Sequence, residues 1–140
     1  MTVIARHVGA IVVAAALVTP AQAEDEAAVV RAATEPVMRQ LEAFRRGDFE
    51  AAYGFASASI RELFDPAAFE QMVRGGYPEI ARSVSATVAG AHVLSDTTVY
   101  LRVRIGGANG QMVEAVYEMV REAQGWRING VRTRSARDAA

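Results

Sequence analysis

Residues 98–119 read TVYLRVRIGGANGQMVEAVYEM, and this stretch decides the fold. Apolar and polar side chains alternate on both sides of residues 106–110, whose Gly-Gly-Ala-Asn-Gly composition is typical of a hairpin loop. Alternation with a period of two indicates half-buried strands, so we predict an antiparallel pair with one face toward a core. The inward row consists of Val99, Leu101, Val103, Ile105, Val113, Ala115, Tyr117 and Met119.

The hairpin also predicts charge pairs on its outward face. If residues 106–110 form the whole loop, Arg102 lies opposite Glu114. A tight turn at residues 124–125 would likewise place Glu122 opposite Arg127. Cross-strand pairs of opposite charge stabilise a sheet by about 0.2–1 kcal/mol each, so both registers are expected to be favourable.

Strand patterns continue on both sides of this hairpin. Residues 83–88 alternate in the same way before it, and Trp126, Ile128 and Val131 mark a last strand after it. The predicted sheet is therefore an antiparallel meander in the second half of the chain.

Helical signals fill the first half of the chain. Thr34 is expected to cap a helix that carries Pro36 in its first turn and ends at Gly47, because proline is tolerated there and glycine often follows a helix. Asp48 is expected to cap the next helix. Further start signals are the capping-box spacing of Ser59 with Glu62 and the Asp65-Pro66 pair. Helices followed by strands predict an α+β fold, with N-terminal helices packed on a curved antiparallel sheet.

The N-terminal 23 residues have the order of a secretory signal peptide. Arg6 precedes the apolar run 8–18, and a small-residue triplet ending at Ala23 precedes an acidic stretch. The run is too short for a membrane span, which needs about 20 residues, so we expect cleavage after Ala23 and no stable membrane anchor. The predicted organisation is a signal peptide (1–23), an acidic segment (24–35), one α+β domain (36–134) and a flexible tail (135–140). The expected location is an exported compartment, the periplasm.

Composition excludes several classes of function. The chain has no cysteine, which excludes disulfides, thiolate chemistry and lipid attachment at a cleavage-site cysteine. Its formal net charge of −1 gives no bulk attraction to nucleic acid, so we expect no nucleic-acid partner. His92 is the one histidine beyond the leader, and a single histidine makes no metal cluster. We expect no metal and no cofactor.

The segment LEAFRRGDFEAAYGFASASIRELFDPAAFEQMVRGGY (41–77), together with GWRING (125–130), resembles a known family. Helix, Gly-Asp and an alanine-and-aromatic helix are similar to the superfamily of nuclear transport factor two and ketosteroid isomerase, a cystatin-like α+β cone. Within it, the chain resembles a family of exported bacterial proteins catalogued as a domain of unknown function. The resemblance implies a cavity between the helices and the concave sheet face, and many members of the superfamily are dimers. Some members are isomerases or cyclases, and others only bind ligands or proteins, so fold does not choose among these functions.

Three functions stay open at this stage. The first is binding of a small apolar ligand or a partner protein in the cone, with pocket candidates Tyr53, Leu101, Val103, Tyr117, Met119 and Trp126. The second is a cofactor-free isomerase or cyclase that uses Tyr117 or Tyr53 with a carboxylate, although the inward row carries no carboxylate. The third is a homodimeric module that pairs through the open sheet face, with interface candidates Tyr100, Arg102, Glu114 and Val116. We favour the first.

Overall fold

The computed structural model describes residues 14–15 and 19–137 of the chain. Most of the predicted signal peptide and the last three residues of the predicted tail lie outside this range. No helix within residues 14–15 and 19–137 is long and apolar enough to cross a membrane.

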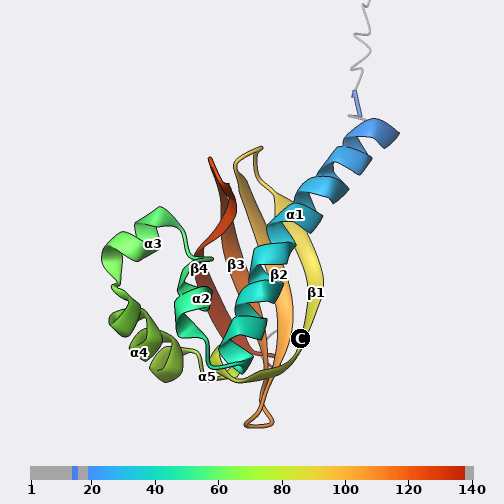
Figure 1. Ribbon diagram of the computed structural model, residues 1–140. Helices are drawn as coiled ribbons and strands as arrows, with labels where there is room; N and C mark the ends of the chain where they lie inside the picture. Colours follow the sequence, from blue (N-terminus) through green and yellow to red (C-terminus); the bar gives the residue numbers. More distant parts are fainter. Residues whose placement is uncertain (1–13, 16–18, 138–140) are drawn as a thin grey trace, which may run out of the picture.

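One long helix, α1 (Pro20–Arg45), dominates the first half of the chain, and its N-terminal part extends beyond the sheet (Figure 1). The prediction that a helix starts at Thr34 is wrong, because Pro36 lies inside α1. Instead of capping a helix, the Thr34 hydroxyl donates to the carbonyl of Val30, at 2.7 Å. An internal proline costs about 3 kcal/mol. This cost is offset because Val37 and Leu41, in the next turns, are fully buried against the sheet.

Four short helices follow α1: α2 (Phe49–Tyr53), α3 (Ala58–Leu63), α4 (Pro66–Gly76) and α5 (Pro78–Ala81). The predicted caps Asp48 and Asp65 are confirmed, since each carboxylate accepts a hydrogen bond from the backbone N–H three residues later. The capping box at Ser59 is wrong, because Ser57 caps α3 and places Ser59 inside the helix. Helix α5 was not predicted from the sequence.

The second half of the chain forms a four-stranded antiparallel meander in the order β1–β2–β3–β4. Its strands are β1 (Ser83–Val93), β2 (Thr98–Gly107), β3 (Met112–Glu122) and β4 (Gly125–Ser135). The helices lie on one face of this curved sheet (Figure 1), so the predicted α+β class is confirmed. Residue 135, where the tail was predicted to begin, is the last residue of β4.

The predicted register between β2 and β3 is wrong by two residues. Arg102 faces Val116, and Glu114 faces Arg104. The ladder ends with Gly106 opposite Met112, so residues 107–111 connect the strands, and the five-residue loop lies one residue later in the chain than predicted. A shift of two keeps every side chain on its predicted face, because side chains alternate with a period of two.

The second predicted charge pair is also wrong. Glu122 faces Gly125 across the turn, and Arg127 faces Val120. Farther along the same pair of strands, a bulge near Glu118 shifts the register of β4. Such bulges redirect the side chains beyond them.

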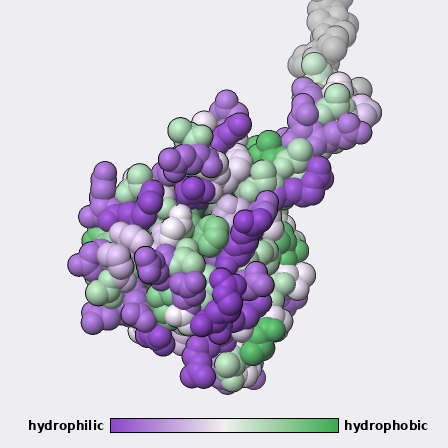
Figure 2. Space-filling model, viewed as in Figure 1, coloured by the Kyte–Doolittle hydropathy of each residue, from purple (hydrophilic) through white to green (hydrophobic). Residues whose placement is uncertain are grey.

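The core lies between α1 and the inner face of the sheet. All eight residues of the predicted inward row are buried, with exposed fractions of 7% or less. The face of the molecule shown in Figure 2 is mostly hydrophilic, with small, scattered apolar areas.

Candidate functional site

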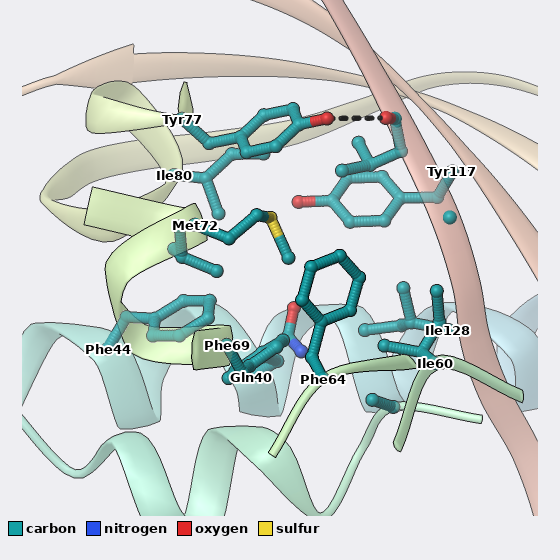
Figure 3. A pocket seen from close by; sticks show the side chains of 14 residues that line it. Gln40, Phe44, Ile60, Phe64, Phe69, Met72, Tyr77, Ile80, Tyr117 and Ile128 are labelled. Atoms are coloured by element: carbon teal, nitrogen blue, oxygen red, sulfur yellow. Dashed lines mark hydrogen bonds between the residues drawn. The ribbon is translucent and has the colours of Figure 1, made fainter. Parts of the chain in front are cut away.

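A cavity of about 250 Å³ lies between the short helices and the β3–β4 side of the sheet. Its walls come from α1, α3, α4, α5 and the two last strands (Figure 3). None of the described lining residues carries a charge at neutral pH. They are Gln40, Phe44, Ala56, Ile60, Phe64, Phe69, Met72, Val73, Tyr77, Ile80, Tyr117, Ile128, Gly130 and Val131.

Tyr117 provides the most unusual polar group of this cavity. It lies on the inner face of β3, opposite Leu101 on one side and Val131 on the other, and it is 1% exposed. Its hydroxyl has no hydrogen-bond partner among the described residues. Figure 3 shows this hydroxyl pointing toward the middle of the cavity, on the side where Met72 lies. A buried hydroxyl without a partner is uncommon and calls for an explanation.

Burial also fixes the charge state of Tyr117. Removal from water raises the pKa of its phenol well above the usual value near 10, because the charged phenolate is disfavoured in an apolar surrounding. At neutral pH the side chain is therefore an uncharged phenol. It can donate a hydrogen bond into the cavity, and it is unsuited to act as a general base.

Two other polar side chains line the cavity, and each donates a hydrogen bond to a backbone carbonyl. The side-chain nitrogen of Gln40 donates to the carbonyl of Ala52 at 3.1 Å, and in Figure 3 its oxygen points toward the cavity. The Tyr77 hydroxyl donates to the carbonyl of Val131 at 3.3 Å. Of these groups, only the Tyr117 hydroxyl and the Gln40 oxygen are directed at the cavity interior.

The structure places one of the six predicted pocket residues in this cavity, namely Tyr117. Leu101, Val103 and Met119 are fully buried in the core and do not line it. Tyr53 also does not line the cavity. Its hydroxyl lies within hydrogen-bond distance of the carbonyls of Arg61 and Phe64, at 3.0 and 2.6 Å. Trp126 lines a separate surface hollow beside α1.

The remaining lining residues were not predicted as site residues. Phe69, Met72 and Val73 have the helical spacing of an amphipathic stripe, but such a stripe signals burial, and a packed core and a cavity wall give the same signal. Gln40 carried one further signal, because it is a polar residue on the buried side of a helix.

The four predicted interface residues lie on the opposite, outer face of the sheet. Tyr100 and Val116 are half-buried, and Arg102 is exposed. Glu114 is paired with Arg134 of β4 at 2.9 Å, and not with Arg102 as predicted.

Neither Glu114 nor Glu118 of β3 is available to Tyr117. Glu118 accepts from the Tyr100 hydroxyl at 3.3 Å and from the Asn129 amide at 3.2 Å, on the outer face. Glu114 lies on the same face. The described residues contain no group of three or more His, Cys, Asp or Glu side chains placed to hold a metal ion.

The fold and the cavity together define an α+β domain in which short helices enclose an apolar pocket against an antiparallel meander. The chain belongs to the family described as Domain of unknown function (DUF4864), whose model matches residues 23–140. Searches of curated proteins and of solved structures found no match. Membership of the nuclear transport factor two-like superfamily stays a prediction from the resemblance.

Proposed function

We propose that this protein binds a small, largely apolar and uncharged molecule in the cavity, with one oxygen of that molecule accepting a hydrogen bond from Tyr117. The observation that carries the proposal is the Tyr117 hydroxyl, which is buried, points into the cavity and has no hydrogen-bond partner among the described residues. An unsatisfied buried hydroxyl costs about 1–3 kcal/mol, and a ligand that supplies an acceptor recovers this cost.

The size and lining of the cavity support a small ligand without charge. An apolar cavity of about 150 Å³ is enough to hold benzene, whereas drug-sized ligands use roughly 300–1,000 Å³. The cavity of about 250 Å³ lies between these values. A charged ligand would lose its hydration and meet no opposite charge among the described lining residues, which is costly.

Binding is favoured over catalysis by the same lining. General acid–base chemistry needs a titratable group that exchanges a proton near neutral pH, and burial moves the pKa of Tyr117 still further above that range than its usual value near 10. The isomerase alternative pairs a tyrosine with a carboxylate, but Glu114 and Glu118 are on the outer face. The Gln40 oxygen would accept from a ligand hydroxyl, so an alcohol fits as well as a ketone.

The test uses two probes of nearly the same shape, acetophenone and isopropylbenzene, which differ in the carbonyl oxygen. Binding of each is measured by calorimetry or ligand-observed NMR for the wild type, for Tyr117→Phe and for Tyr53→Phe, a control outside the cavity. We expect both probes to bind, and Tyr117→Phe to weaken acetophenone about three- to tenfold relative to isopropylbenzene. Tyr53→Phe should leave this ratio unchanged.

Two results would contradict the proposal. If neither probe binds, and native mass spectrometry of the purified protein shows no retained small molecule, the cavity is not a binding site. If both bind but Tyr117→Phe leaves their affinity ratio unchanged, the tyrosine makes no contact with the oxygen.

A second candidate function is self-association through the outer sheet face. It is supported by an open groove there, beside which Tyr100 and Val116 are half-buried next to Glu118 and Arg132. Sedimentation of the wild type and of Val116→Arg tests it. Only a dimer that this substitution disrupts would support it.

We also propose that the protein is exported and cleaved after Ala23. This cleavage would remove Thr19, which caps α1, and the first turn of the helix. The first buried residue of α1 is Ala33, so core packing would be preserved. The intact mass of the protein recovered from the exported fraction tests the position of the cut.

A further inference from the structure

A second hollow, of about 450 Å³, lies at the end of the domain where α1 stops and β1 begins. Arginine side chains from three different segments meet around it. Arg45 comes from the last turn of α1, Arg74 from the last turn of α4, and Arg82 from the residue between α5 and β1. None of the described lining residues is acidic. They are Phe44, Arg45, Gly47, Phe49, Arg74, Ala81, Arg82, Ser83 and Ala108.

Arg45 is held in place by Ser83. Its Nε donates to the backbone carbonyl of Ser83 at 3.2 Å and to the side-chain hydroxyl at 3.1 Å. Ser83 is 4% exposed, so this anchor is shielded from water. These bonds occupy Nε and leave the two terminal amino groups of Arg45 for another acceptor.

Arg74 is held by a ring and by a carboxylate. Its guanidinium carbon lies 4.3 Å from the centre of the Phe49 ring, and its Nε and one terminal nitrogen donate to Glu70 at 3.2 and 3.1 Å. Glu70 offsets part of one positive charge. The second terminal nitrogen of Arg74 donates to none of the residues that the structure describes and can reach a further acceptor.

Arg82 has a fixed backbone and an uncommitted side chain. Its carbonyl accepts from the N–H of Ala108 at 2.7 Å. No acceptor for its guanidinium occurs among residues 14–15 and 19–137, and the side chain is exposed. Three permanent positive charges thus surround one hollow, and in the described part of the chain Glu70 is the one carboxylate that pairs with any of them.

We propose that this hollow is a binding site for an oxyanion, namely a phosphate, sulfate or carboxylate group. A guanidinium presents paired N–H groups that match the oxygens of such an anion, and its charge shortens and strengthens each hydrogen bond. Because two of the three arginines are already held by other contacts, binding orders mainly the Arg82 side chain. This site is separate from the apolar cavity, and Phe44 contributes to the walls of both.

The test is a titration of the isotopically labelled full chain with inorganic phosphate, followed by NMR at constant ionic strength with chloride as the reference. We expect saturable shifts of the backbone N–H signals of Gly47, Ser83 and Ala108. Arg82→Ala should weaken phosphate binding about tenfold. Arg61→Ala, which removes an exposed arginine from α3 and changes the net charge equally, is the matched control and should have no effect.

Sulfate and acetate, titrated in the same way, report whether the site prefers a tetrahedral or a planar anion. Sedimentation with phosphatidylglycerol vesicles, compared between wild type and Arg82→Ala, distinguishes a lipid-borne phosphate from a free one. The proposal is overturned if none of these anions shifts the three signals beyond the chloride reference. It is also overturned if Arg82→Ala and Arg61→Ala weaken binding equally, because attraction would then depend on net charge alone.

Discussion

Replacing Tyr117 by phenylalanine should stabilise the ligand-free protein, which is opposite to the usual effect of removing a buried hydroxyl. Deleting a typical buried hydroxyl removes a hydrogen bond that contributes about 0.5–1.5 kcal/mol to stability. The Tyr117 hydroxyl has no partner to lose among residues 14–15 and 19–137, and its burial costs about 1–3 kcal/mol. After allowing for the contacts of the lost oxygen atom, we expect a gain of about 1 kcal/mol in the free energy of unfolding.

Urea and thermal unfolding, followed by circular dichroism at pH 7, measure this change. A gain of 1 kcal/mol corresponds to a rise of roughly 3–5 °C in the melting temperature of a domain of this size. Any bound molecule must first be removed by unfolding and refolding, because a ligand that binds only the folded state adds its own stabilisation.

Two matched variants serve as controls. Tyr77→Phe and Tyr53→Phe delete hydroxyls that do have partners, at 3.3 Å for Tyr77 and at 2.6 Å for the shorter of the two Tyr53 bonds. Both should lower the free energy of unfolding by about 0.5–1.5 kcal/mol. If Tyr117→Phe destabilises the protein as much as these controls do, the Tyr117 hydroxyl has a hydrogen-bond partner in the folded protein, which contradicts the prediction.

Three further predictions follow from the same geometry. Burial raises the pKa of Tyr117 in the folded protein, so above pH 10 the unfolded chain loses the phenol proton first and the folded state becomes less stable. The free energy of unfolding of the wild type should therefore fall by up to about 1.4 kcal/mol per pH unit more than that of Tyr117→Phe. Urea unfolding at pH 9–11 measures this difference. Val73→Ile adds a methylene beside the cavity and should change the free energy of unfolding by less than about 1 kcal/mol. Val103→Ile adds a methylene in the filled core and should lower it by about 1–3 kcal/mol. Equal costs for the two variants would mean that no cavity exists. Glu114→Arg should be destabilising alone and partly rescued by Arg134→Glu in a double-mutant cycle, and rescue by an arginine of β2 instead would contradict the observed pairing.

The sequence predicted the buried face of the sheet correctly and its register incorrectly, for one physical reason. Alternation with a period of two assigns every side chain to a face, and a register shift of two residues leaves that assignment unchanged. Face and burial of Leu101 were therefore predictable. Its partner across the ladder, Tyr117, depends on which residues form the loop, because moving the loop by one residue shifts the register by two, and loop composition does not fix that position.

Helix boundaries that depend on a local hydrogen bond were predictable, whereas a boundary that depends on tertiary packing was not. The caps Asp48 and Asp65 were predictable, because a capping bond spans three residues and is specified locally. The continuation of α1 through Pro36 was not predictable, because the packing of Val37 and Leu41 against the sheet outweighs the cost of a proline inside a helix.

The chain by itself thus determined the α+β class, the meander, the inward row and the inward direction of Tyr117. Only the tertiary structure decided that this hydroxyl would end in a cavity and that Arg45, Arg74 and Arg82 would meet around one hollow. The physical reason is that both sites depend on how the four short helices α2–α5 pack against the curved sheet. That placement is the sum of many weak packing contacts between segments far apart in the chain, and no local pattern of residues records it.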